Sequence, residues 1–146
     1  MSTSKKREQL VRTMFRELRR TVANSVLFNL RMAESLHMNP TDLQFINFLE
    51  MDGPLTPSQL AAMSRLTSGG VTVVLDRLEK AGIVIREPNP NDRRSSLVRA
   101  APTFLRKAHA AYGQMSEATD ALLAQFSDKD LSIVAAFLKK ANDTRG

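Results

Sequence analysis

Residues 56–82 read TPSQLAAMSRLTSGGVTVVLDRLEKAG, and this stretch decides the fold. It opens with a capping box, in which the Thr56 side chain caps a helix and Gln59 reaches back to it. After one short helix and a turn, Thr67 or Ser68 caps a second helix with apolar residues at helical spacing. The stretch ends in a glycine, which suits the left-handed position after a helix. The pattern predicts two helices joined by a short turn.

A β-hairpin is expected directly after this helix pair. Residues 83–87 form a β-rich run, residues 88–96 contain turn formers and charges, and residues 97–99 form a second short run. Two short strands around a polar loop indicate a hairpin. Helix, turn, helix and hairpin in this order are the winged helix-turn-helix arrangement, which binds DNA through its second helix.

Long amphipathic helices flank this core on both sides. Apolar residues recur every three or four positions over residues 8–36 and 102–126, and a last helix follows a capping box at Ser127. One small winged domain cannot cover such long apolar stripes, so we expect them to pair between two copies of the chain. The predicted fold is mainly α-helical with a small β-hairpin. Residues 37–101 form the winged helix region, and residues 1–36 and 102–146 form the helical dimerisation region.

The start of the second helix of the pair is the first candidate site. Its small side chains leave room for base edges, and glycine permits close backbone approach. An alternative interpretation is a loosely wound helix start. Arg77, two turns further on, is expected to meet a phosphate. The residues expected to read bases are Thr67, Ser68, Gly69, Gly70, Thr72 and Val73.

The tip of the hairpin, residues 89–96, is the second candidate site. An arginine at this tip can reach the minor groove, where a planar, permanently charged group suits the negative potential. Asp92 would fix the loop or Arg94, and Arg93 would meet a phosphate or solvent. The alternative interpretation is a solvated surface loop.

The stretch from Leu55 to Leu97 resembles the DNA-binding core of the MarR family. The likeness lies in Leu60-Ala61, in Val71-Thr72 with residues 75–82, and in the wing sequence NPNDRR at residues 89–94. The resemblance implies that Arg94 is the wing arginine and Asp92 its orienting partner. It also implies a homodimer built from the terminal helices, and a small aromatic or phenolic effector. Ala100-Ala101 departs from the family's usual Leu-Thr, which weakens the expected cap of the next helix.

Composition limits the function classes. The net charge is +6, but residues 37–101 carry seven basic and seven acidic side chains, so any DNA affinity there depends on where the charges lie. The chain has no cysteine, and its two histidines lie far apart, so no metal or cofactor is expected. No catalytic motif indicates an enzyme. The polar, basic start does not resemble a signal peptide and no segment resembles a membrane span, so a cytoplasmic protein is expected.

The leading hypothesis is therefore a sequence-specific regulator of transcription, most simply a repressor, that binds a near-palindromic operator in double-stranded DNA. The alternative is a winged-helix protein–protein interaction module, which would bind a partner protein without affinity for DNA. An effector pocket lined by Met32, Phe45 and Phe48 is a further hypothesis, which periodicity does not separate from ordinary core. The basic residues 1–7 are expected to fray, with phosphate contact as an alternative.

Overall fold

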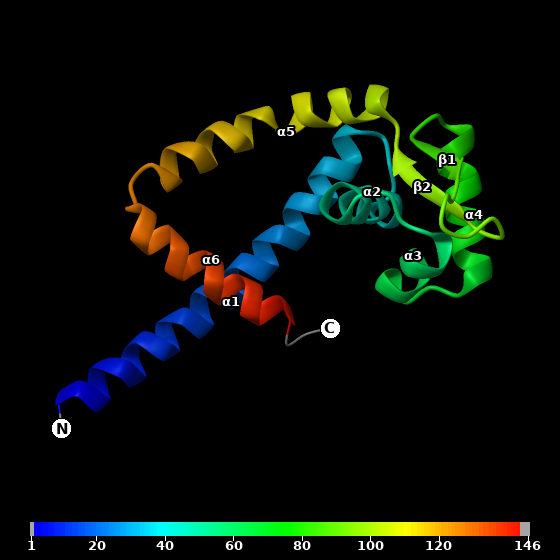
Figure 1. Ribbon diagram of the computed structural model, residues 1–146. Coiled ribbons are helices and arrows are strands. Elements are labelled where there is room, and N and C mark those ends of the chain that lie inside the picture. Colours follow the sequence, from blue (N-terminus) through cyan, green and yellow to red (C-terminus); the bar gives the residue numbers. More distant parts are fainter. Residues whose placement is uncertain (1, 144–146) are drawn as a thin grey trace. The chain divides into compact units, whose positions relative to one another are not determined.

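The computed structural model describes residues 2–143, which form two compact units divided after Ala108. The first unit holds the first four helices, the hairpin and the start of α5, and the second unit holds the rest of α5 and all of α6 (Figure 1). The elements are α1 (Ser2–Ser35), α2 (Pro40–Asp52), α3 (Pro57–Ser64), α4 (Ser68–Lys80), β1 (Val84–Pro88), β2 (Ser96–Ala100), α5 (Pro102–Leu123) and α6 (Asp128–Asp143). This order confirms the predicted mainly helical fold with one hairpin.

Side-chain caps explain where the helices of the first unit begin. The Asp42 backbone N–H donates to Asn39 Oδ1 at 2.8 Å, which caps α2. Thr56 and Gln59 form the predicted reciprocal capping box of α3. Of the two candidates for the cap of α4, the structure selects Thr67, whose side chain accepts the Gly70 N–H. Each bond satisfies a helix N–H that has no partner within the helix.

The core of the first unit lies where α2, α3, α4 and the hairpin meet. Its largest fully buried side chains come from all these elements and are Leu43, Phe45, Ile46, Leu60, Val71, Leu75, Leu78, Val84 and Val98. The strands pair antiparallel with Ile85 opposite Arg99, and Leu55 adds a bridge to Val98. The two helices of the predicted helix-turn-helix are thereby fixed to the hairpin by one shared core.

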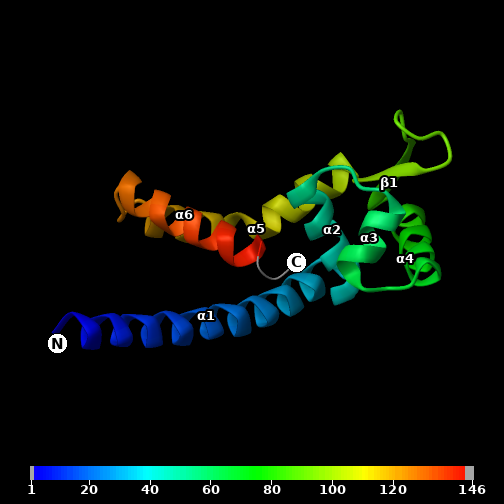
Figure 2. The ribbon, with the colours of Figure 1, turned by 60° about the horizontal axis from the view of Figure 1, so that its bottom comes forward.

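The predicted fraying is wrong for residues 2–7, because α1 is helical from Ser2 onward, and Met1 lies outside the described residues. Only the C-terminal end of α1 is buried, through Met32 and Ala33, while its N-terminal half runs beyond the rest of the first unit (Figure 2). The helix continues because residues 2–35 contain no proline or glycine that would break it.

The second unit has little core of its own. Its helix α6 begins at a capping box in which the Asp130 N–H donates to Ser127 Oγ, as predicted from the sequence. Within residues 109–143, apart from the undescribed side chain at 114, no side chain is classed as buried. None of the helices in the described part of the chain is long and apolar enough to cross a membrane.

Candidate nucleic-acid interface

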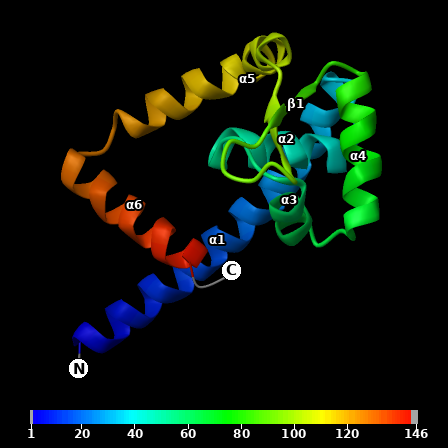
Figure 3. The ribbon, with the colours of Figure 1, turned by 45° about the vertical axis from the view of Figure 1, so that its right-hand side comes forward.

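Helix α4 presents an open face made of the residues that the sequence singled out. Val71, Val74, Leu75 and Leu78 turn inward to the core, which leaves the opposite face to solvent. Ser68, Gly69, Thr72 and Val73 are exposed on it. Figure 3 shows α4 along an edge of the first unit, with α3 beside it. The structure therefore brings together most of the predicted base-reading residues.

Gly69 and Gly70 differ in their surroundings, which the sequence did not show. A Cβ atom at Gly69 would meet nothing within 4 Å. A Cβ atom at Gly70 would lie 3.3 Å from Thr67 Oγ1 and 3.7 Å from Leu66 Cβ. Because Thr67 Oγ1 caps α4, a side chain at Gly70 would press on the cap itself. Gly69 is the glycine that leaves open space in front of the helix.

Arg77 is bound to the protein's own Asp42. Its Nε donates to Asp42 Oδ2 at 3.0 Å and a second nitrogen donates to Oδ1, so the fork of the guanidinium holds both carboxylate oxygens. The side chain of Asp42 is 8% exposed and that of Arg77 is 47% exposed. The hydrogen bond and the attraction of Asp42 raise the pKa of Arg77 further above its already high value. The pair ties α4 to the start of α2, and the predicted phosphate contact of Arg77 stays a prediction.

A second ionic link, which the sequence analysis missed, joins α4 to the hairpin. Arg86 on β1 donates to Asp76 Oδ1 at 2.6 Å, and its Nε lies 3.4 Å from Glu79 Oε2. Asp76 and Glu79 are one helical turn apart on α4, so a single arginine can reach both carboxylates. This arginine offsets negative charge at the C-terminal half of a helix that would otherwise repel a polyanion. The only sequence signal was an arginine on a short strand after two spaced acids.

The loop of the hairpin is closed by its own hydrogen bonds. Asn89 is buried; its Nδ2 donates to Ser95 Oγ at 2.9 Å and its Oδ1 accepts the Asn91 N–H at 3.0 Å. Asp92 Oδ1 accepts the Arg94 N–H at 2.9 Å. Figure 2 shows this loop projecting beyond the neighbouring helices. The expected role of Asp92 in shaping the loop thus corresponds to a contact with the backbone of Arg94.

The two arginines at the tip point to solvent. Arg93 and Arg94 are both exposed. Within residues 2–143, no carboxylate forms an ion pair with either guanidinium. Two uncompensated cations on a projecting loop are suited to phosphate or groove contacts. Together with the open face of α4, they make a candidate interface for duplex DNA.

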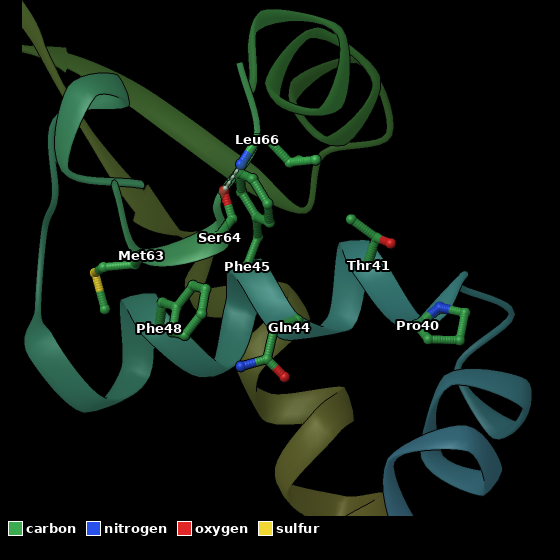
Figure 4. A pocket seen from close by; sticks show the side chains of 8 residues that line it. All are labelled: Pro40, Thr41, Gln44, Phe45, Phe48, Met63, Ser64 and Leu66. Atoms are coloured by element: carbon green, nitrogen blue, oxygen red, sulfur yellow. Dashed lines mark hydrogen bonds between the residues drawn. The ribbon is translucent and has the colours of Figure 1, made fainter. Parts of the chain in front are cut away.

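A pocket of about 450 Å³ lies between α2 and the end of α3 with the residues that follow it (Figure 4). Phe48 is half-buried and Phe45 is fully buried, and both contribute to the wall. The remaining lining residues are Pro40, Thr41, Gln44, Met63, Ser64 and Leu66. Met32, the third residue of the predicted effector pocket, does not line this pocket and lies in the core instead. The volume is within the usual range for small-molecule sites.

Large apolar side chains remain exposed on the terminal helices. On α1 they are Leu10, Val11, Met14, Phe15, Val22, Val26, Leu27 and Leu30. In the second unit they are Met115, Leu122, Leu123, Phe126, Ile133, Val134, Phe137 and Leu138. Patches of this extent are unusual on a monomeric soluble protein and mark interaction surfaces.

Comparison with known proteins places the chain among transcriptional regulators. A model described as the MarR family matches residues 38–95. An uncharacterised HTH-type transcriptional regulator of Bacillus subtilis, YcgE, is 36% identical over 145 residues, which cover 98% of this chain and 93% of that protein. The likeness to this regulator therefore includes the terminal helices as well as the winged core.

Solved structures share the same fold. A mutant of MepR from a multidrug-resistant S. aureus clinical isolate has a TM-score of 0.74 at 17% identity, covering 90% of this chain and 97% of that one. Another mutant of S. aureus MepR, bound to an oligodeoxyribonucleotide, has a TM-score of 0.57 at 17% identity and covers 90% and 98% of the two chains. At these identities the likeness shows a shared fold and nothing more.

Proposed function

This chain belongs to the MarR family and is a DNA-binding transcriptional regulator, and we propose that it acts as a homodimeric repressor that reads a near-palindromic operator in double-stranded DNA. The observation that carries the proposal is the open face of α4 next to a projecting loop with two unpaired arginines. The MepR mutant that is bound to an oligodeoxyribonucleotide has the same fold, and this likeness supports the proposal. A transcriptional regulator acts on chromosomal DNA, so we propose that this protein acts in the cytoplasm. An enzymatic role is not part of the proposal.

In the proposed complex, α4 lies in the major groove and the hairpin reaches the adjacent minor groove. Ser68, Gly69, Thr72 and Val73 face the bases, Thr67 and Gly70 hold the start of the helix, and Arg93 meets a phosphate. Arg94 enters or borders the minor groove, with its backbone fixed by Asp92. Arg77 and Arg86 keep α4 and the hairpin in position through their carboxylate partners.

We expect Arg94→Ala to weaken operator binding by about 1–3 kcal/mol per contact, because the groove loses a fixed cation. Asp92→Ala should cost less, since it only loosens the loop, and Arg93→Ala should be the mildest of the three. Fluorescence anisotropy on one operator duplex, repeated over a range of salt concentrations, measures all three. Each lost phosphate contact should also lower the salt slope by about one.

The same titrations separate this function from a protein–protein adaptor. If Arg94→Ala binds duplex DNA as tightly as the unaltered protein while dimer and fold persist, the loop is only a solvated turn. If the unaltered protein has no salt-dependent affinity for any duplex and instead binds a partner protein, the adaptor hypothesis replaces the regulator.

We also propose that a small aromatic or phenolic effector binds in the pocket beside α2. Two phenylalanine rings supply apolar wall, and Thr41, Gln44 and Ser64 supply polar groups. Leu66 lines the pocket and directly precedes the cap of α4, so an occupant that displaced it would move the start of α4. Phenol at millimolar concentration should lower operator affinity, and Gln44→Trp, which fills the pocket, should remove that response. If phenol lowers the operator affinity of Gln44→Trp as much as that of the unaltered protein, the effector binds elsewhere.

A further inference from the structure

The open face of α4 carries an apolar side chain where a polar reader of bases would be expected. Val73 is 62% exposed, whereas the other valines of the helix, Val71 and Val74, are buried. Side chains on a helix lean toward its N-terminus, so the side chain of Val73 leans over the position four residues earlier, Gly69. Gly69 has no side chain, and a Cβ atom there would meet open space. The isopropyl group of Val73 is therefore left uncovered.

The polar groups of this face are largely used within the protein. Thr72 Oγ1 donates to the Ser68 carbonyl oxygen at 3.0 Å, and Thr67 Oγ1 accepts the Gly70 N–H. Arg77, the only arginine of α4, holds Asp42 with both sides of its fork. The donors left to read a base edge are few.

The N-terminal part of α4 also lacks the residue types that most often read bases. Guanine is usually read by arginine or lysine, and adenine by asparagine or glutamine. The first nine residues of α4 read SGGVTVVLD and contain none of these four types. In contrast, an exposed apolar group is suited to the methyl group of thymine, which only that DNA base presents in the major groove.

We propose that Val73 reads the 5-methyl group of a thymine in each half-site of the operator. This inference rests on the proposed function, since it requires α4 to lie in the major groove. It deepens that function by assigning specificity to an apolar contact, with Gly69 as the residue that leaves room for the thymine. The operator should then have a thymine at the position beneath Val73 in both half-sites.

Replacing thymine by deoxyuridine tests this directly, because it removes the methyl group and keeps every hydrogen-bonding atom. Each thymine of a recovered operator half-site is exchanged singly, and affinity is measured by fluorescence anisotropy. At one position the exchange should weaken binding about fourfold, as expected for one buried methyl-sized group. Val73→Ala should weaken binding to the thymine operator but cause little further loss on the uracil operator. Thr72→Ser removes a methyl group from the neighbouring position and should cost the same on both duplexes.

Two other results would overturn the inference. One is an operator in which no thymine-to-uracil exchange changes affinity, and the other is a Val73→Ala loss of equal size on both duplexes. Either result leaves the regulator intact if the unaltered protein still selects one operator over unrelated DNA. Failure to select any operator would instead overturn the proposed function.

Discussion

Gly69→Leu should bring DNA affinity down to the non-specific level while the protein stays folded. The leucine side chain would extend from the exposed face of α4 into the space that a base edge must occupy. Specific binding typically exceeds non-specific binding by about a thousandfold or more, so the loss should be of that order. The variant should be at least as stable as the parent, because replacing a helical glycine favours the helix by roughly 0.5–1 kcal/mol.

Gly69→Ala is the matched control for this substitution. Its single methyl group meets nothing within 4 Å in the protein, so it should share the gain in stability and lose far less affinity than Gly69→Leu. Thermal unfolding followed by circular dichroism, together with anisotropy on the operator, measures both properties. Unchanged affinity of Gly69→Leu would show that α4 does not enter the groove in this orientation. Gly70 is unsuitable for the test because a side chain there presses on Thr67.

The double substitution Ile133→Asp and Phe137→Asp should convert the proposed dimer into monomers. The two side chains lie one turn apart on α6 and are 62% and 38% exposed in the single chain. Carboxylates buried without partners at a dimer interface would strongly oppose association. Light scattering at micromolar concentration should give about 16.3 kDa instead of twice that mass. Operator affinity should fall by about a hundredfold or more, since two linked contacts become one.

Ser132→Asp is the control for the dimer test, because Ser132 lies on the opposite, polar face of α6. It introduces one negative charge where the double substitution introduces two, and it should leave the mass unchanged. The first unit has its own core, so the helices of that unit should keep their circular dichroism signal even when the double variant is a monomer. The proposed interface would be wrong if the double variant remained a dimer, or if the unaltered protein were a stable monomer.

Local sequence rules were sufficient for the elements of the fold. The caps at Asn39 and Thr56, the hairpin and the left-handed Gly82 were all predictable, because each depends on residues within a few positions of one another. The choice between Thr67 and Ser68 as cap was open, since both side chains can accept the same N–H group. The start of α1 was misjudged because charge alone does not stop a helix.

Contacts between distant residues could not be predicted in the same way. From the sequence Arg77 is expected to meet a phosphate, and no local pattern indicates Asp42 as its partner. Their ion pair joins residues 35 positions apart and exists only because α2 and α4 meet. The difference between Gly69 and Gly70 likewise depends on where Thr67 and Leu66 lie. The residues that position α4 could therefore be identified only from the tertiary structure.

Selection from a pool of random duplexes tests the central claim most directly. The unaltered protein is incubated with the pool at about 0.15 M salt, and the bound duplexes are recovered and sequenced over several rounds. The account predicts one enriched, near-palindromic sequence whose half-sites are centred about one helical turn, 10–10.5 base pairs, apart. A pool without any enriched sequence, or an enrichment that Gly69→Leu reproduces, would contradict it.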